Sequence, residues 1–161
     1  MAVKAMAAMS VLTALAWGFP TMSFAYGKSH ALNEADTNFV RDDLRSLVID
    51  KEHGKMYTDG KPVAKRSYKQ AEQYCRSLKY AGFSDWRLPS KEEMVSLLNN
   101  KRRDVTVKQA FRNVLPEIYW TSTAASHGRI WNVDFDLGRY SKRKPREDYR
   151  LLCVRDRSGN D

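Results

Sequence analysis

The sequence predicts an α+β domain in which two helices accompany antiparallel strands. Three observations support this class: a β-hairpin near residues 47–57, two helices that each begin with a capping box, and an alternating apolar pattern after residue 116. The order along the chain is therefore a hairpin, two helices and then several antiparallel strands. No internal repeat or low-complexity tract interrupts it.

The hairpin is predicted from two short runs of β-branched and aromatic residues. Residues 47–50 form the first strand and residues 55–57 the second, with the turn running from Asp50 to Gly54. Asp59 and Gly60 mark another turn, and Pro62 keeps the loop that follows out of a sheet.

The first helix is expected to begin at the N-cap Ser67, with Gln70 completing the capping box, and to end with Gly82 at the C′ position. One face of this helix carries the apolar stripe Ala71, Tyr74, Cys75 and Leu78. Cys75 therefore faces the core, where a disulfide partner could reach it.

The second helix begins at another capping box, Ser90 with Glu93. Its apolar face is Met94, Leu97 and Leu98, and Asn99 and Asn100 end it.

Beyond the helices, residues 101–108 read as a charged surface loop and residues 111–115 as a helical turn that stops before Pro116. Strands are predicted at 118–123, at 131–135 and, after a turn at 136–138, from Arg139. Residues 141–148 then form a basic loop, and 149–155 a last, central strand.

The first 25 residues have the pattern of a secretory signal peptide. Lys4 supplies the positive charge, residues 5–19 are apolar, and Ser23 and Ala25 fit a cleavage site before Tyr26. A membrane anchor is the weaker alternative, because the apolar run is shorter than the roughly 18–20 residues that span a bilayer. The expected organisation is signal peptide 1–25, flexible arm 26–38, domain 39–156 and polar tail 157–161.

Export bears on the two cysteines, Cys75 and Cys153, which lie 78 positions apart (153 − 75). In an oxidising compartment two cysteines usually pair, so we expect a disulfide; two separate buried thiols are the alternative. The expected location is the periplasm or the medium outside the cell.

The charge balance is strongly basic. The chain has 28 Lys+Arg against 19 Asp+Glu, a net charge of +9, and loss of the leader with its single lysine leaves +8 (27 − 19). Such a surface favours acidic partners, namely anionic polysaccharide, lipid headgroups or extracellular nucleic acid, although it could also serve solubility alone. The net charge alone does not distinguish between these partners and a role in solubility.

Several sequence blocks resemble a known family, the DUF1566 domains, which include the C-terminal domain of the Legionella collagen-like adhesin (Lcl). The resemblance covers about residues 39–156 and rests on five blocks in the family's order: Ala71-x-x-Tyr74-Cys75-x-x-Leu78, Asp85-Trp86-Arg87-Leu88-Pro89-Ser90-x-x-Glu93-Met94, Tyr119-Trp120-Thr121-Ser122-Thr123, Trp131-x-Val133-x-Phe135-x-x-Gly138 and Leu152-Cys153-Val154-Arg155.

This resemblance implies a C-type-lectin-like fold with neighbouring termini and a disulfide from the first helix to the last strand, which matches Cys75 and Cys153. The best-known relative is an adhesin domain that binds sulfated glycosaminoglycans through a basic surface. This chain has no collagen-like repeat, so trimeric display is not implied here.

The candidate binding residues are basic side chains, since lysine and arginine meet sulfate and carboxylate groups and arginine does so with a bidentate fork. A solvated basic face without a ligand is the alternative. One cluster lies near the C-terminus and a second follows the second helix; the members are Arg139, Lys142, Arg143, Lys144, Arg146 and Arg150, and then Lys101, Arg102, Arg103, Lys108 and Arg112.

The aromatic residues are expected mainly in the core. Trp86, between Asp85 and Arg87, is predicted to be a core plug, although an Arg beside a Trp can also stack in a binding site. Core positions are likewise expected for the other conspicuous aromatics, and one exposed ring beside a basic loop could instead stack on a sugar; the residues are Tyr119, Trp120, Trp131 and Phe135.

A calcium site is disfavoured. Asn132 and Asp134 are similar to the Trp-Asn-Asp motif of sugar-binding C-type lectins, but the partner Glu-Pro-Asn or Gln-Pro-Asp motif is missing and calcium needs six to eight oxygens. No metal or cofactor is expected.

An enzyme is disfavoured too. The histidines, His30, His53 and His127, show no metal-ligand spacing, and no nucleophile elbow or phosphate loop occurs. The related fold also hosts formylglycine-generating enzymes with an active-site cysteine pair, whereas both cysteines here occupy structural positions.

The sequence-based hypothesis is thus a non-enzymatic exported module that binds anionic polysaccharide. The alternative is a subunit that docks on a protein of the cell envelope. No dedicated nucleic-acid motif is found, and no transmembrane segment is expected after cleavage.

Overall fold

The computed structural model describes residues 37–159. The predicted signal peptide, its cleavage site before Tyr26 and nearly all of the predicted arm lie outside the described residues and stay predictions. The elements follow one another as β1 (Phe39–Asp42), β2 (Leu47–Asp50), β3 (Lys55–Thr58), α2 (Tyr68–Ser77), α3 (Lys91–Ser96), β4 (Ile118–Ala125), the 3-10 turn η1 (Ser126–Gly128), β5 (Arg129–Asp134), β6 (Arg139–Arg143) and β7 (Val154–Asp156).

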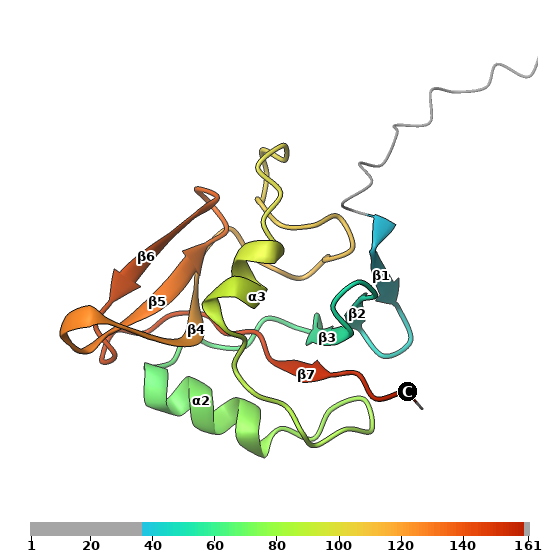
Figure 1. The fold of residues 1–161 in the computed structure, drawn as a ribbon, viewed down its shortest axis with the longest axis horizontal. Helices are drawn as coiled ribbons and strands as arrows, with labels where there is room; N and C mark the ends of the chain where they lie inside the picture. The colour runs from blue at the N-terminus through green and yellow to red at the C-terminus, as the bar shows by residue number, and fades with distance from the viewer. Residues whose placement is uncertain (1–36, 160–161) are drawn as a thin grey trace, which may run out of the picture. The chain divides into compact units, whose positions relative to one another are not determined.

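The strands form two antiparallel sheets, ordered β1-β2-β3-β7 and β4-β5-β6 (Figure 1). The predicted hairpin is confirmed, since Leu47 pairs with Thr58 and Asp50 with Lys55. The C-terminal strand β7 lies beside β3, so the end of the domain returns to its beginning. The α+β class with two helices and antiparallel sheets is therefore confirmed.

Helix α2 begins where the capping box predicts, and the Gln70 side chain accepts the backbone N–H of Ser67 at 3.2 Å. It ends earlier than predicted, because Leu78 turns to an extended conformation (ψ 127°). Gly82 is not its C′ residue. Gly82 (φ +86°) and Ala81 (φ +54°) instead form a tight turn. Tyr80 and Phe83, on either side of that turn, exchange backbone hydrogen bonds.

Helix α3 also begins at its predicted capping box. The Ser90 hydroxyl accepts the Glu93 N–H at 3.2 Å, and the Glu93 carboxylate accepts the Ser90 N–H at 2.7 Å. Met94 and Leu97 are fully buried, as the apolar pattern predicts, whereas Leu98 is half-buried. The predicted end at Asn99 and Asn100 is wrong, because the helix ends at Ser96 with Leu97 as its C-cap.

Three predictions for the second half of the chain are wrong in part. Residues 141–148 are not one basic loop, because Ser141 to Arg143 belong to β6 and pair with β5. The carboxylate of Asp134 accepts the N–H groups of Asp136 and Leu137, at 3.0 and 3.1 Å, and so shapes a turn tight enough for the chain to return as a strand. Residues 111–115 form bends and no helical turn.

The predicted last strand, 149–155, is the third. Tyr149 and Arg150 make isolated bridges to Arg66 and Tyr119, and a continuous strand begins only at Val154. The segment passes from the neighbourhood of one sheet to the other, so it cannot remain in a single ladder. Cys153 consequently lies immediately before β7 and not within a strand.

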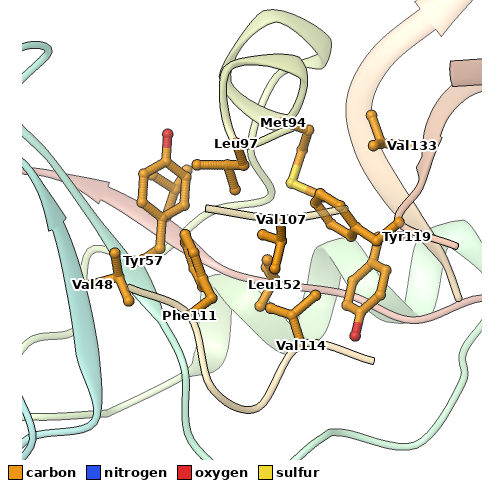
Figure 2. Packing of buried hydrophobic residues seen from close by; sticks show 12 residues of the cluster. Val48, Tyr57, Met94, Leu97, Val107, Phe111, Val114, Tyr119, Val133 and Leu152 are labelled. Carbon is orange, nitrogen blue, oxygen red and sulfur yellow. The ribbon is translucent and has the colours of Figure 1, made fainter. Parts of the chain in front are cut away.

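The core has two parts. One packs residues of both sheets against α3, including Tyr57, Met94 and Val133 (Figure 2). The other gathers around the disulfide between Cys75 and Cys153, whose Cα atoms are 5.5 Å apart. The predicted pairing of the two cysteines is confirmed.

The predicted core positions of the aromatics are confirmed for Trp86, Tyr119, Trp120 and Phe135, each at most 2% exposed. Trp86 donates its indole N–H to the carbonyls of Tyr80 and Phe83. Its chain neighbours serve the fold through ion pairs, Arg87 with Glu93 and Asp85 with Arg155, each with a closest approach of 2.7 Å.

Candidate anion-binding site

The predicted anion-binding residues differ in how available their charges are. Arg150 is engaged within the fold: it donates to Glu117 from Nε (3.1 Å) and Nη2 (2.8 Å) and to the Val63 carbonyl from Nη1 (2.7 Å). Arg102 likewise pairs with Asp104. These two arginines stabilise the domain. The other predicted residues are exposed or half-buried: Lys101, Arg103, Lys108, Arg112, Arg139, Lys142, Arg143, Lys144 and Arg146. Of these, Arg112 pairs with Asp43.

The strand β6 divides the C-terminal basic cluster between two faces, because successive side chains of a strand point to opposite sides. Tyr140 and Lys142 lie on one face. Arg139 and Arg143 lie on the other, where Arg143 stands over the Tyr149 ring at 5.9 Å.

The two basic clusters approach each other at one end of β6. The loop that carries Lys101 and Arg103 packs on the β5–β6 turn, where the Thr106 N–H donates to the Phe135 carbonyl at 2.8 Å. A side chain added at Gly138 would collide with the amide of Asn100. Arg139 follows Gly138 in the chain as Lys101 follows Asn100, so the segments that carry these two cations lie side by side.

Trp131 does not occupy the core, which corrects the sequence-based prediction. It is half-buried, and its ring packs edge-on against Tyr140 with centroids 5.6 Å apart. Two ammonium groups approach its centroid, that of Lys91 at 4.1 Å and that of Lys142 at 4.7 Å. Lys91 also lies 4.3 Å from the Tyr140 centroid. We call these four residues the lysine–aromatic cluster.

The scaffold explains why Trp131 leaves the core. On its face of β5, Val133 is covered by the buried apolar cluster around α3, whereas Trp131 lies two residues earlier, beside the first residue of that helix. A tryptophan there has one side against protein and the other toward solvent. The strand itself is confirmed, but the expected burial of only its apolar face is wrong, because Asn132 and Asp134 are buried while Trp131 is only half-buried.

Two elements position the lysines. Lys91 is the first residue of α3, and its backbone N–H donates to the Thr123 hydroxyl at 2.9 Å, next to an irregularity in the pairing of β4 with β5. Lys142 lies opposite Trp131 in the β5–β6 register, and its ammonium donates to the Ser126 hydroxyl at 3.3 Å. Both side chains are thereby directed to one ring.

The charges of this cluster are uncompensated. Within residues 37–159, no carboxylate pairs with Lys91 or Lys142, whereas many other basic side chains have acidic partners, as Lys65 has Glu117. The rings hold the ammonium groups through cation–π attraction, which is worth about 0.5–1 kcal/mol at an exposed site and leaves their positive charge available to an anion. Tyr140 is 48% exposed beside them. The arrangement suits an anionic ligand with an apolar surface.

Lys91 was not among the residues that the sequence predicts for this site. It stands alone in the sequence after Ser90, apart from both basic clusters. Only the packing of α3 on the sheet brings it to Trp131, so no pattern in the sequence identifies it.

The sequence was compared with known proteins. The pattern of the Lcl C-terminal domain family matches residues 38–155, which is most of the chain. The chain belongs to the Lcl C-terminal domain family. No curated protein matches it.

Among solved structures, this Lcl C-terminal domain is similar to the Yersinia pseudotuberculosis adhesin InvE, with 17% identity and a TM-score of 0.45. The likeness covers 63% of this chain and 32% of that protein, so the chain spans about a third of its length. A similarity of this size carries no argument about fold or function.

Asn132 and Asp134, which are similar to a calcium-binding motif, have structural partners in this Lcl C-terminal domain. Asn132 is fully buried and its side-chain oxygen accepts from the Ser141 hydroxyl at 2.8 Å. Asp134 holds the β5–β6 turn, as described above. No group of three potential metal ligands occurs among the described residues.

Two of the histidines lie in the described part of the domain. His53 contacts the carboxylate of Asp50 at 2.8 Å, and His127 occupies the β4–β5 turn with φ +59°. His30 lies outside the described residues. In residues 37–159, none of the helices has the length and apolar character that crossing a membrane requires.

Proposed function

We propose that this Lcl C-terminal domain is a non-enzymatic, adhesin-like binding module that holds anionic polysaccharide through the lysine–aromatic cluster. The observation that carries the proposal is the convergence of two unpaired ammonium groups on the single Trp131 ring. A sulfate or carboxylate group beside them would relieve the repulsion of two like charges.

The chemistry of the surroundings supports a sugar polymer as the anion. Tyr140 offers an exposed ring on which the apolar face of a pyranose can pack. Exposed cations also lie beyond both ends of β6, Lys101 and Arg103 on the loop at the β5–β6 turn and Lys144 and Arg146 after the strand. A linear polyanion with regularly spaced charges would meet several of them at once.

The proposal includes the setting in which the module works. Export to the periplasm or the cell exterior, after removal of residues 1–25, would bring it to such polymers, and a C-type-lectin-like scaffold would present them with this face. The family resemblance, which implies binding of sulfated glycosaminoglycans, supports the same ligand class.

The test is retention on heparin compared with a plain cation exchanger of equal charge density. The wild-type protein should elute from heparin at the higher salt concentration. In Lys91→Gln/Lys142→Gln this difference should disappear, and the slope of log affinity against log salt should fall by about two, by analogy with counterion release from nucleic acids.

The matched control is Lys51→Gln/Lys69→Gln, which removes two exposed lysines that lie over no aromatic ring in the described part of the chain. This variant has the same net charge and should keep the preference for heparin. Equal losses in the two double variants would show that only total charge matters and would refute the site.

A second candidate function is docking on an envelope protein. The observation that favours it is that β6 is the terminal strand of its sheet, so an extended acidic segment of another protein could add beside it. A stoichiometric partner that stays bound at high salt, recovered equally by wild type and Lys91→Gln/Lys142→Gln, would support docking over polysaccharide binding.

A further inference from the structure

A second feature lies on another part of the domain, away from the four residues of the lysine–aromatic cluster. It is a partly enclosed pocket of about 400 Å³. The pocket is bounded by the end of α2, the loop after β3 and the segment that leads into β7, and Cys153 contributes to its wall. This volume is at the lower end of the range for small-molecule sites.

The walls of the pocket are mainly apolar. Tyr74 and Leu78 come from α2 and the residue after it, Val63 from the loop, and Leu151 from the segment before β7. Tyr80 adds a second ring, held in place because its hydroxyl donates to the Ser46 carbonyl at 3.2 Å. Rings fixed in this way form a cavity for an aromatic or branched apolar group.

Polar groups also line the pocket, and they differ in whether they already have hydrogen-bond partners. The Tyr119 oxygen accepts the Leu115 N–H at 2.9 Å, and in the described part of the chain no group accepts the hydroxyl proton of Tyr119, which is therefore a donor to spare. Figure 2 shows this hydroxyl at the Val114 end of the core cluster, next in sequence to the pocket-lining Asn113.

Of the charged side chains that line the pocket, two are engaged with residues outside it and one is a lysine. Asp59 is engaged by Arg41, and Arg150 by Glu117. Lys61 is exposed and, among the described residues, has no acidic partner. An anionic group is the complement of a pocket with an unpaired ammonium and a hydroxyl donor.

We propose that this pocket binds a small monocarboxylate with an aromatic or branched apolar group. The apolar group lies between Tyr74, Tyr80 and Leu78, and the carboxylate lies near Lys61 at the edge. The site is independent of polysaccharide binding, because the pocket shares no residue with the lysine–aromatic cluster.

The experiment uses 4-phenylbutyrate as the probe and amide chemical shifts of the ¹⁵N-labelled protein as the readout. Saturable shifts are expected at Gly60, Lys61 and residues 151–153. Lys61→Gln should weaken binding about fivefold, the loss of one solvent-exposed charge contact. The neutral analogue 4-phenylbutan-1-ol should bind wild type and Lys61→Gln with equal affinity. That affinity should match the affinity of Lys61→Gln for the acid.

Two controls separate the pocket from general effects. Lys79→Gln removes a nearby exposed lysine that does not line the pocket and should bind the acid as wild type does. Val63→Trp should fill the pocket and abolish binding of both probes, with its melting temperature and heparin retention unchanged.

Absent or non-saturable shifts at the pocket residues in wild type would overturn the proposal. So would an unchanged affinity of the acid for Lys61→Gln, or unchanged binding by a folded Val63→Trp. None of these outcomes affects the heparin test, so the two proposals fail separately.

Discussion

Single side chains determine the character of the surface around β6. The ammonium groups of two lysines lie over the Trp131 ring. Trp120, in the neighbouring strand, is instead fully buried and donates its indole N–H to the Arg66 carbonyl at 2.8 Å. The two tryptophans differ in whether a helix covers them. Whether a helix covers the ring therefore decides whether the tryptophan belongs to the core or to the surface.

Gly138 shows how one position joins the two basic clusters. It has φ +62° and lies against Asn100, while Gly54 has φ +59° and nothing within 4 Å of an added Cβ. Gly54→Ala should lower the free energy of unfolding by about 1 kcal/mol through backbone strain alone. Gly138→Ala should cost about 0.5 kcal/mol more, because the exposed Asn100 side chain must turn aside and the added Cβ lies 3.3 Å from the Thr106 Cγ2.

Urea denaturation of both alanine variants measures this difference. Equal losses would mean that the Asn100 side chain turns aside without cost, so that its contact with Gly138 does not help to hold the loop on the β5–β6 turn.

At the scale of elements, α3 is held by a network of charges around Glu93. Its carboxylate accepts hydrogen bonds from Nη1 and Nη2 of Arg87, at 2.8 and 2.7 Å, and lies 3.5 Å from the Lys55 ammonium. Burial alone would raise the pKa of Glu93, but the Arg87 and Ser90 hydrogen bonds and the two positive charges lower it overall. The same residue completes the capping box, so the network and the helix depend on each other.

The lowered pKa of Glu93 makes α3 sensitive to acid. The folded state binds this proton less tightly than the unfolded state, so the stabilisation is present above the ordinary glutamate pKa of about 4.3 and is lost as pH falls through the lower folded value. Glu93→Gln should therefore lower the free energy of unfolding by about 1 kcal/mol at pH 7, because charged hydrogen bonds are lost. At low pH the difference in this free energy between the variant and the wild type should become smaller.

Unfolding free energies between pH 7 and pH 3 provide the measurement. Glu92→Gln is the control, since Glu92 is an exposed acidic residue of the same helical turn. A Glu93→Gln deficit that stayed constant with pH would contradict the role assigned to this carboxylate.

At the scale of the whole molecule, the disulfide ties α2 to the segment that crosses between the sheets. Cys75 and Cys153 are 78 residues apart in sequence, and both belong to the core part that contains Trp86 and Trp120. The link therefore constrains nearly all of the chain between the first helix and the last strand, while the lysine–aromatic cluster lies on other elements.

Removing the link tests this division of roles. Cys75→Ala/Cys153→Ala should lower the free energy of unfolding by up to about 4 kcal/mol, the loop entropy of a link this long. Wherever the variant is folded, it should still prefer heparin, because Lys91 and Lys142 remain in place. The measurements are urea denaturation and salt elution; free thiols in the native protein or a loss below about 1 kcal/mol would contradict the structural role.

Local signals account for the parts of the fold that could be predicted. The capping boxes at Ser67 and Ser90 and the hairpin turn after Asp50 each depend on residues close in sequence, and the structure has all three. The C-terminal end of α2 could not be predicted, because a glycine such as Gly82 suits both a helix C′ position and a tight turn. In the structure it belongs to the turn with Ala81.

The chain by itself determined the class of fold, the helix starts and the hairpin, because caps and turns are local. It also determined the pairing of Cys75 with Cys153, because two cysteines allow a single pairing. Tertiary structure alone decided which charges are available. It engaged Arg150 with Glu117, turned Lys142 and Arg143 to opposite faces of β6, and brought Lys91 to Trp131. These contacts join residues far apart in sequence, and packing between elements determines which of them meet.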